Sequence, residues 1–296
     1  MNWDDLKVFL AVARTESLSG AGRGLKVDPA TVGRRIGRLE EQLGAPLFAK
    51  SPQGYALTDA GQRLLAHAER AEQAMQAASE ELAGQSGGLS GQIRIGAPDG
   101  CANYLLPQVC ARIAEDNPDL ELQIVALPRV FNLSKREADM AIGVSPPSAG
   151  RLTVQKITDY KLHLAAHEDY LARHPPLRGL EDLKGHQMVG YIADMIFDKE
   201  LDYLSECDVE RVPLASNSVS VQFNWIRQAG GIGIVHDFAI PSTTRIRKVL
   251  EDKLSLRRSF YMIRHSDDRR LERLNLLAQQ ISDGLRAEVS RLEAMC

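Results

Sequence analysis

The residues best suited to chemistry lie between Leu18 and Gly44, where two helical patterns meet at a tight turn. Asp28 can accept hydrogen bonds from the free N–H groups of a first helical turn, and Pro29 fits the first helical position, where its missing N–H costs nothing. A tight turn before Asp28 separates this helix from one rich in small residues. The residues that repeat at helical spacing and are predicted to face inward are Val32, Ile36, Leu39 and Leu43.

The opposite face of this predicted helix is basic. Short polar residues near a helix start can reach base edges in the major groove, and arginines bond phosphates or guanine. A solvated amphipathic helix is the alternative, but turn, cap and basic face all agree on a DNA-reading helix. Two short extended segments around Gly54 predict a wing that meets the flanking backbone or minor groove. The predicted DNA-binding residues are Arg23, Pro29, Ala30, Thr31, Gly33, Arg34, Arg35, Arg38, Lys50 and Gln53.

Composition is that of a globular protein with more than one core: 296 residues, 44% hydrophobic and 25% charged. The net charge of -3 provides no general attraction to DNA, but between Arg23 and Lys50 six basic residues face three acidic ones. No apolar run approaches the roughly 18–20 residues of a membrane span, and no signal-peptide pattern opens the chain. The four cysteines lack zinc-ligand spacing. We expect a cytoplasmic protein without a metal or cofactor.

A long helix is predicted after Thr58, which is a good cap. Its apolar residues alternate four and three apart, as in a heptad repeat. Such a stripe packs either on its own domain or against a second copy of the helix. Residues 85–91 then break the helix as a flexible hinge. The stripe consists of Leu64, Ala68, Ala71, Met75, Ala78 and Leu82.

The remaining residues alternate between strand and helix patterns, which predicts an α/β fold with parallel strands and crossover helices. The first set comprises strands at 91–98, 120–128 and 138–144 and a helix at 103–118. The second comprises strands at 161–167, 186–192 and 231–237 and a helix at 218–231. A strand at 259–265 and a long helix at 269–293 close the chain.

The order FLAVARTESLSGAGRGLKVDPATVGRRIGRLEEQLGAPLF, a small wing and then LTDAGQRLLAHA resembles the N-terminal domain of LysR-type transcriptional regulators. Gly33 stands where a serine is common, and Gln53 where the wing often carries arginine. The resemblance implies a winged helix-turn-helix domain (1–58), a linker helix and hinge that pair two chains (59–90), and an effector-binding domain (91–296). That last domain is expected to have two α/β lobes, as in periplasmic binding proteins: lobe I, 92–162 and 267–296, and lobe II, 163–266.

In open α/β sheets, ligands bind beyond the carboxyl ends of the strands and at helix N-termini. Taken singly, each polar residue there could instead be a surface charge, a structural histidine or a cap. Relatives commonly place a Ser or Thr in the first loop to hold a carboxylate, whereas Pro98 or Gly100 stands there here, which disfavours a simple carboxylate effector. The predicted effector-binding residues are Asp99, Gly100, Cys101, Asn103, Arg129, Val130, Ser145, Asp194, Asn217, Ser218, His236 and Phe238.

These patterns predict a transcriptional regulator that is controlled by a small molecule. Its partners would be double-stranded operator DNA, the effector, further copies in a homodimer or homotetramer, and RNA polymerase. No nucleophile elbow, phosphate-binding glycine loop or metal-ligand cluster indicates an enzyme. The alternative is redox sensing through Cys207 or through Cys101, whose pKa a helix N-terminus would lower. Peroxide-sensing relatives, however, use two cysteines close together in the second lobe.

Overall fold

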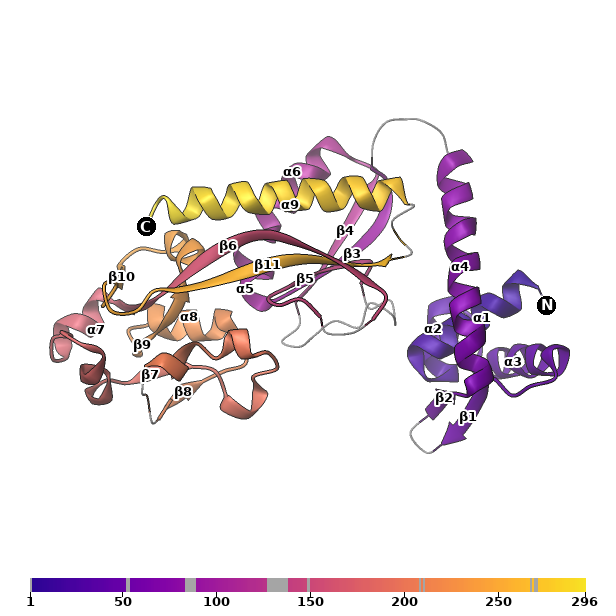
Figure 1. Cartoon of the computed structure of the whole chain (residues 1–296), viewed down its shortest axis with the longest axis horizontal. Helices are drawn as coiled ribbons and strands as arrows, with labels where there is room; N and C mark the ends of the chain where they lie inside the picture. The colour runs from indigo at the N-terminus through magenta and orange to yellow at the C-terminus, as the bar shows by residue number, and fades with distance from the viewer. Residues whose placement is uncertain are drawn as a thin grey trace. The chain divides into compact units, whose positions relative to one another are not determined.

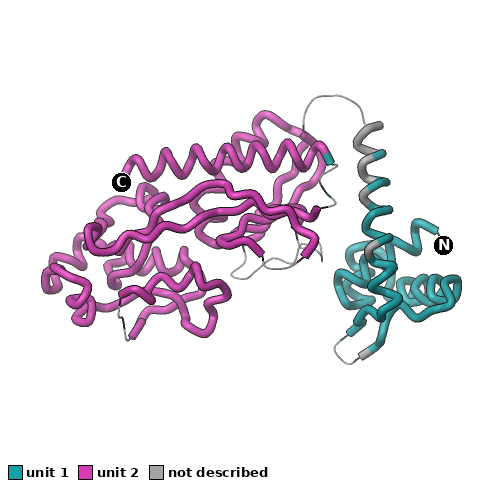
Figure 2. The backbone as a smooth tube through the Cα atoms, in the orientation of Figure 1, with its two compact units in different colours: residues 1–87, 134–136, 267–271 teal, residues 88–133, 137–266, 272–296 magenta. Residues whose placement is uncertain are grey.

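The structure, a computed structural model, describes residues 2–51, 54–82, 89–126, 138–147, 150–207, 209, 211–266, 268 and 271–296. The chain divides into two compact units (Figure 2). Unit 1 comprises residues 1–87, 134–136 and 267–271, and unit 2 comprises residues 88–133, 137–266 and 272–296. Among the described helices, none is long and apolar enough to cross a membrane.

Unit 1 is a helical domain with a two-stranded wing (Figure 1). Polar caps set its helix starts: the side chains of Asn2, Ser17 and Asp28 each accept from a backbone N–H three residues later. The wing strands are antiparallel, and Ser51 lies opposite Gly54. The elements are α1 (Trp3–Thr15), α2 (Leu18–Leu25), α3 (Pro29–Leu43), β1 (Phe48–Ser51), β2 (Gly54–Leu57) and α4 (Asp59–Leu82).

The core of unit 1 lies between α1, α3 and the base of the wing. Val32, Ile36 and Leu39 are buried there, as their spacing predicts. The prediction for Leu43 is wrong, because its side chain is 42% exposed. Leu43 is the last residue of α3, and the chain leaves the helix at Gly44 with a left-handed φ of 67°. The buried Leu47, which follows that turn, closes this end of the core instead.

Unit 2 is built on a mixed sheet that is nine-stranded among the described residues, with the order β4-β3-β5-β11-β6-β9-β7-β8 and β10 also paired to β6. The predicted α/β class is confirmed. Its helices are α5 (Asp99–Tyr104), α6 (Leu106–Asp116), α7 (Glu168–Arg173), α8 (Val219–Arg227) and α9 (Glu272–Glu293). Its strands are β3 (Gly91–Ala97), β4 (Leu120–Ala126), β5 (Met140–Gly143), β6 (Leu152–His167), β7 (Met188–Gly190), β8 (Leu214–Ala215), β9 (Ile232–His236), β10 (Ile246–Lys248) and β11 (Leu256–His265).

The two long strands β6 and β11 join two lobes (Figure 1). They pair antiparallel from Leu162 opposite Leu256 to Leu152 opposite His265. In lobe I, β11 pairs antiparallel with β5, β5 pairs in parallel with β3, and β3 pairs in parallel with β4. In lobe II, the end of β6 pairs antiparallel with β9 and β10. Strand β7 pairs in parallel with β9 on one side and with β8 on the other. Helix α9 packs against α6 and β6.

Two predicted elements of unit 2 differ from the structure. The predicted helix 103–118 is two helices that meet at Leu105, because Pro107 lacks an N–H and belongs in the first turn of a new helix. The predicted strand 161–167 is only the end of the sixteen-residue β6. Its first half is mostly half-buried or exposed, so no continuous apolar pattern reveals it.

Candidate functional site

The first turn of helix α3 is fixed by hydrogen bonds, and an exposed arginine follows it. The Asp28 carboxylate accepts from the Thr31 backbone N–H at 2.8 Å and from its hydroxyl at 2.6 Å, and these bonds lower the pKa of Asp28. Arg34 is exposed one turn further along, whereas Arg35 is half-buried. The start of α3 is therefore held rigid while Arg34 extends into solvent, which suits a helix that enters a groove.

The structure gives Arg38 a partner inside unit 1. Its Nε donates to Asp5 Oδ2 at 3.0 Å, and its Nη2 also contacts this fully buried carboxylate. Arg38 thus ties α3 to α1, although its sequence position also suggested a DNA contact. Lys50 on the wing is exposed, and its Nζ lies 5.9 Å from the centroid of the Tyr55 ring. Gln53 lies outside the described residues.

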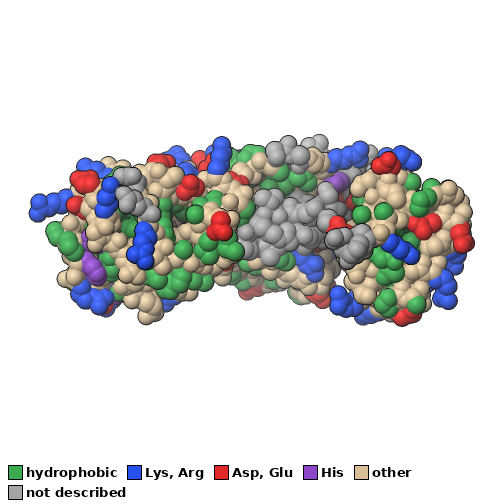
Figure 3. All heavy atoms as spheres, turned by 90° about the horizontal axis from the view of Figure 1, so that it is seen from below, with side chains coloured by type: hydrophobic (Ala, Val, Ile, Leu, Met, Phe, Trp, Pro, Cys, Tyr) green, Lys and Arg blue, Asp and Glu red, His purple; other side chains and the backbone are tan. Residues whose placement is uncertain are grey.

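Basic side chains do not form one continuous patch on the face drawn in Figure 3. Lys and Arg, in blue, alternate there with acidic and apolar side chains. This mixture agrees with the small net charge of -3. Any attraction to DNA must therefore come from local groups. The exposed predicted residues are Arg23, Pro29, Ala30, Arg34, Arg38 and Lys50, and Thr31, Gly33 and Arg35 are half-buried.

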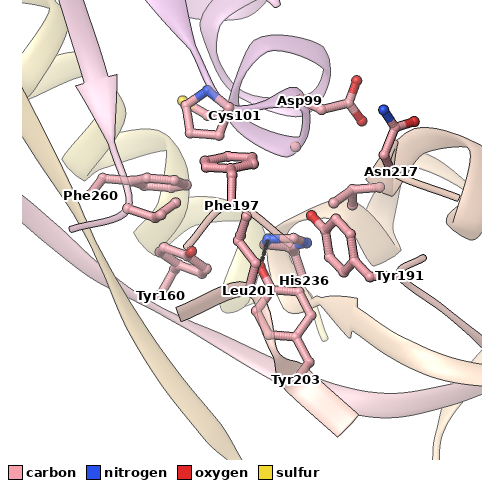
Figure 4. A pocket seen from close by; sticks show the side chains of 14 residues that line it. Asp99, Cys101, Tyr160, Tyr191, Phe197, Leu201, Tyr203, Asn217, His236 and Phe260 are labelled. Carbon is pink, nitrogen blue, oxygen red and sulfur yellow. Dashed lines mark hydrogen bonds between the residues drawn. The ribbon is translucent and has the colours of Figure 1, made fainter. Parts of the chain in front are cut away.

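A second candidate site is a pocket between the two lobes of unit 2 (Figure 4). Lobe I contributes the loop after β3, and lobe II contributes the ends of β7 and β9 and the start of α8. Aromatic side chains dominate its walls, and the free volume is only about 20 Å³. It is lined by Pro98, Asp99, Gly100, Cys101, Val144, Tyr160, Tyr191, Phe197, Leu201, Tyr203, Asn217, Val219, His236 and Phe260.

The Asp99 carboxylate bridges the two lobes. It accepts from the Ser220 backbone N–H at 2.8 Å and from the Ser218 hydroxyl at 3.1 Å, both at the start of α8. On its own helix, the Asn103 amide donates to the Asp99 carboxylate at 3.2 Å and to its carbonyl at 2.8 Å. A carboxylate is stabilised at this position because the first-turn N–H groups of α8 and the helix dipole both favour negative charge.

The imidazole of His236 forms the floor of the pocket and is neutral. Its exposed fraction is 4%, and burial lowers its pKa to about 3. Nε2 lies 3.5 Å from the Tyr203 hydroxyl, and Nδ1 has no hydrogen-bond partner among the described residues. The ring stacks on Tyr160, with centroids 5.4 Å apart. A Cβ at Gly100 would lie 3.3 Å from this ring, so a larger residue at position 100 would crowd His236.

The structure brings most of the predicted effector residues together. Asp99, Gly100, Cys101, Asn217 and His236 line the pocket, and Asn103 and Ser218 bond to Asp99. Ser145 of lobe I donates to the Asp198 carboxylate of lobe II, which forms a second bridge between the lobes.

Two described residues of the prediction neither line the pocket nor form these bonds. Phe238 is buried behind it against Tyr160, and Asp194 is exposed on a short 3₁₀ helix. Arg129 and Val130 lie outside the described residues. Sequence reasoning missed the aromatic walls because buried aromatics ordinarily indicate core, and no spacing distinguishes them: Tyr160, Tyr191, Phe197, Tyr203 and Phe260.

The cysteine environments oppose thiol reactivity. Cys101 is fully buried, and burial raises the pKa of its thiol; the expectation of a lowered pKa is therefore wrong, because desolvation outweighs the short helix that begins nearby. Burial raises the pKa of Cys110 and of Cys207 to about 11. Among the residues that the structure describes, no group of three metal-ligating side chains is assembled.

Two family models cover nearly the whole chain. The bacterial regulatory helix-turn-helix protein model of the lysR family matches residues 3–62, and the LysR substrate binding domain model matches residues 86–286. Together with the winged domain and the two-lobed sheet, these matches define the class. The chain belongs to the LysR-type transcriptional regulators, which are DNA-binding proteins with an effector-binding domain.

Known relatives agree with this family. The transcriptional regulator CrgA of Neisseria meningitidis is 28% identical over 190 residues, which cover 64% of this chain and 64% of CrgA, slightly less than two thirds of its length. The full-length structure of the Vibrio cholerae virulence activator AphB has a TM-score of 0.58 at 24% identity and covers 95% of this chain and 98% of AphB. A full-length OxyR variant of Pseudomonas aeruginosa has a TM-score of 0.69 at 17% identity, with 97% and 98% covered. Both structures share the fold.

Proposed function

We propose that this chain is a sequence-specific transcriptional regulator whose α3 reads operator DNA and whose interlobe pocket binds a small-molecule effector. The observation that carries the DNA-binding half is the start of α3, where the Asp28–Thr31 bonds fix the helix and leave Arg34 exposed. The observation that supports the effector half is Asp99, which links lobe I to α8 of lobe II. A ligand between the lobes changes their equilibrium to the extent that it binds one arrangement more tightly.

Each predicted domain has its own function in this proposal: residues 1–58 bind DNA, residues 59–90 link and pair two chains, and residues 91–296 sense the effector. We place the protein in the cytoplasm as a homodimer or homotetramer, with RNA polymerase as a further partner and no catalytic role. Redox sensing is disfavoured, because burial raises the pKa of both cysteines that it would use, Cys101 and Cys207.

The DNA-binding proposal predicts that Arg34→Ala weakens operator binding. If Arg34 contacts a base edge, the loss is about 1–3 kcal/mol and specificity at that base pair relaxes. If it contacts a phosphate, affinity falls for all sequences alike and the salt slope decreases by about one. Gel-shift titrations at several salt concentrations, on a site selected from genomic fragments, distinguish the two contacts.

The matched control is Arg257→Ala, which removes an exposed arginine from unit 2. It should leave both affinity and salt slope unchanged. Equal effects of Arg34→Ala and Arg257→Ala, or no effect of either, would exclude α3 from the DNA interface.

A further inference from the structure

The pocket between the lobes already contains a carboxylate at the position where an anion would bind. Helix α8 has nine residues, and its first turn donates the Ser220 N–H and the Ser218 hydroxyl to Asp99. A second carboxylate brought to this helix start would meet occupied donors and a like charge. The protein's own side chain therefore takes the place of an anionic ligand.

The lining of the pocket offers no positive charge to an anion, and Arg258, which acts on Tyr160 and Tyr203 from outside the lining, is paired with Glu200. Among the described residues that line it, Asp99 is the one acidic side chain, and neither lysine nor arginine is present. No salt bridge to Asp99 forms within the described part of the chain. The walls present the rings of Tyr191, Phe197 and Tyr203, whose electron-rich faces attract cations.

His236 provides an independent indication that the pocket is built for a ligand. Its side chain is more than nine-tenths buried and faces into the pocket, and its Nδ1 has no partner in the described structure (Figure 4). A buried polar atom without a partner costs free energy unless a bound group satisfies it. A neutral imidazole nitrogen can accept a hydrogen bond, as a ligand N–H requires.

We propose that this pocket binds a small protonated amine carried on an aromatic or apolar body, and that Asp99 excludes carboxylate effectors. This inference rests on the proposed effector function and specifies its ligand class. The ammonium group pairs with Asp99 and the aromatic faces, and the apolar body packs against the walls formed by residues such as Tyr160 and Phe260.

Entry requires Phe197 to move. With Phe197 and Leu201 in the lining, the free volume of about 20 Å³ is too small for an aromatic amine. Phe197 stands between the 3₁₀ helices Ala193–Met195 and Lys199–Leu201, beside Asp198, which Ser145 bonds from the other lobe. Truncating Phe197 should enlarge the pocket without changing its charge.

Three probes with one ring and different charges test the ligand class: benzylamine (cationic), benzamide (neutral) and benzoate (anionic). In calorimetric titrations of the purified full chain, benzylamine should bind at least about tenfold more tightly than benzamide, which corresponds to about 1.4 kcal/mol, and benzoate more weakly still. Asp99→Asn should abolish the preference for benzylamine over benzamide. Asp99→Ser should free the start of α8 and give measurable benzoate binding.

Phe197→Ala is the control for size. It should strengthen the binding of benzylamine and benzamide alike and preserve the order of the three probes. Circular dichroism checks that each variant is folded. If both Asp99 variants are unfolded, the order in which the three probes bind Phe197→Ala tests the ligand class. The inference is overturned if benzoate binds the wild type as tightly as benzylamine, if Asp99→Asn retains the preference, or if no probe binds Phe197→Ala.

Operator binding by the wild type, measured in parallel, separates this inference from the proposed function. A chain that binds its operator but shows no preference for benzylamine retains the DNA-binding proposal and loses only the ligand class. A chain that prefers benzylamine but binds no DNA would retain the ligand class and lose the DNA-binding proposal.

Discussion

At the scale of single residues, two buried ionisable groups illustrate how the surroundings decide what a side chain does. Asp5 is fully buried and accepts from the Arg38 guanidinium, and this contact links α1 to α3. His236 is buried without a counter-ion, and its pKa falls to about 3. The first residue is structural although it pairs with a predicted DNA contact. The second is available to a ligand.

The lowered pKa of His236 predicts a loss of stability in acid. The unfolded chain binds a proton at His236 near pH 6.5, whereas the folded chain does so only near pH 3. Stability therefore decreases as pH falls from 6.5 towards 3, by about 1.4 kcal/mol for each pH unit. Chemical denaturation at pH 7, 6 and 5 should show that His236→Phe removes this part of the pH dependence.

The same substitution at the exposed His67 is the control, because it replaces a histidine that lies outside the pocket. If the slope of stability against pH is the same for His236→Phe as for the wild type, burial does not lower the pKa of His236 in the folded protein.

At the scale of elements, the two halves of α4 differ in burial: the first half packs on unit 1, and the stripe further along is exposed at Ala78. Its first half packs on its own unit: Ala68 is buried, Leu64 and Ala71 contact the same core, and Glu72 forms a paired ion bridge with Arg14 of α1. Further along the heptad stripe, Ala78 is exposed. Packing on its own domain is therefore confirmed for the first half of the stripe. For the second half, we propose that it pairs two chains.

This division changes which substitution tests assembly. A glutamate at Ala71 would enter the core of unit 1, whereas Ala78→Glu places like charges only where two α4 helices would meet. We expect Ala78→Glu to raise the dimer dissociation constant at least about tenfold, or about 1.4 kcal/mol. Sedimentation over a dilution series measures this constant.

Gln62→Glu adds the same charge to an exposed position on nearly the opposite side of α4 and should leave assembly unchanged. Two variants with identical dissociation constants would assign the dimer contact to another surface.

Caps and short-range patterns made the elements of unit 1 predictable, because Ser17, Asp28 and Pro29 act within one turn of the helix they start. The pairing of β6 with β11 joins residues about a hundred positions apart, and no local pattern contains it. The same holds for the site. Asp99 was predictable from the end of a strand and Asn217 from the start of a helix, but the aromatic walls come from distant segments that only the tertiary fold brings together.

At the scale of the whole molecule, the two lobes form one body because β6 and β11 run through both, whereas the described core of unit 1 is separate. Between the lobes, the bonds from Asp99 to α8 and from Ser145 to Asp198 hold the two sides of the pocket together. The proposed DNA-binding residues lie in unit 1, and the pocket lies in unit 2.

This organisation predicts two separable unfolding transitions. Leu39 and Leu277 are both fully buried, in units 1 and 2 respectively, and each Leu→Ala substitution costs about 2–5 kcal/mol. Scanning calorimetry should show that each variant lowers one transition and leaves the other in place. The shift should be larger for Leu39→Ala, because a domain of about 60–100 residues loses about 4–8 °C per kcal/mol, against about 2–4 °C for one of about 150–250 residues. Operator DNA, which stabilises by mass action only the unit that binds it, should raise the transition that Leu39→Ala lowers. A single transition that both variants and the DNA shift together would mean that the units unfold as one body.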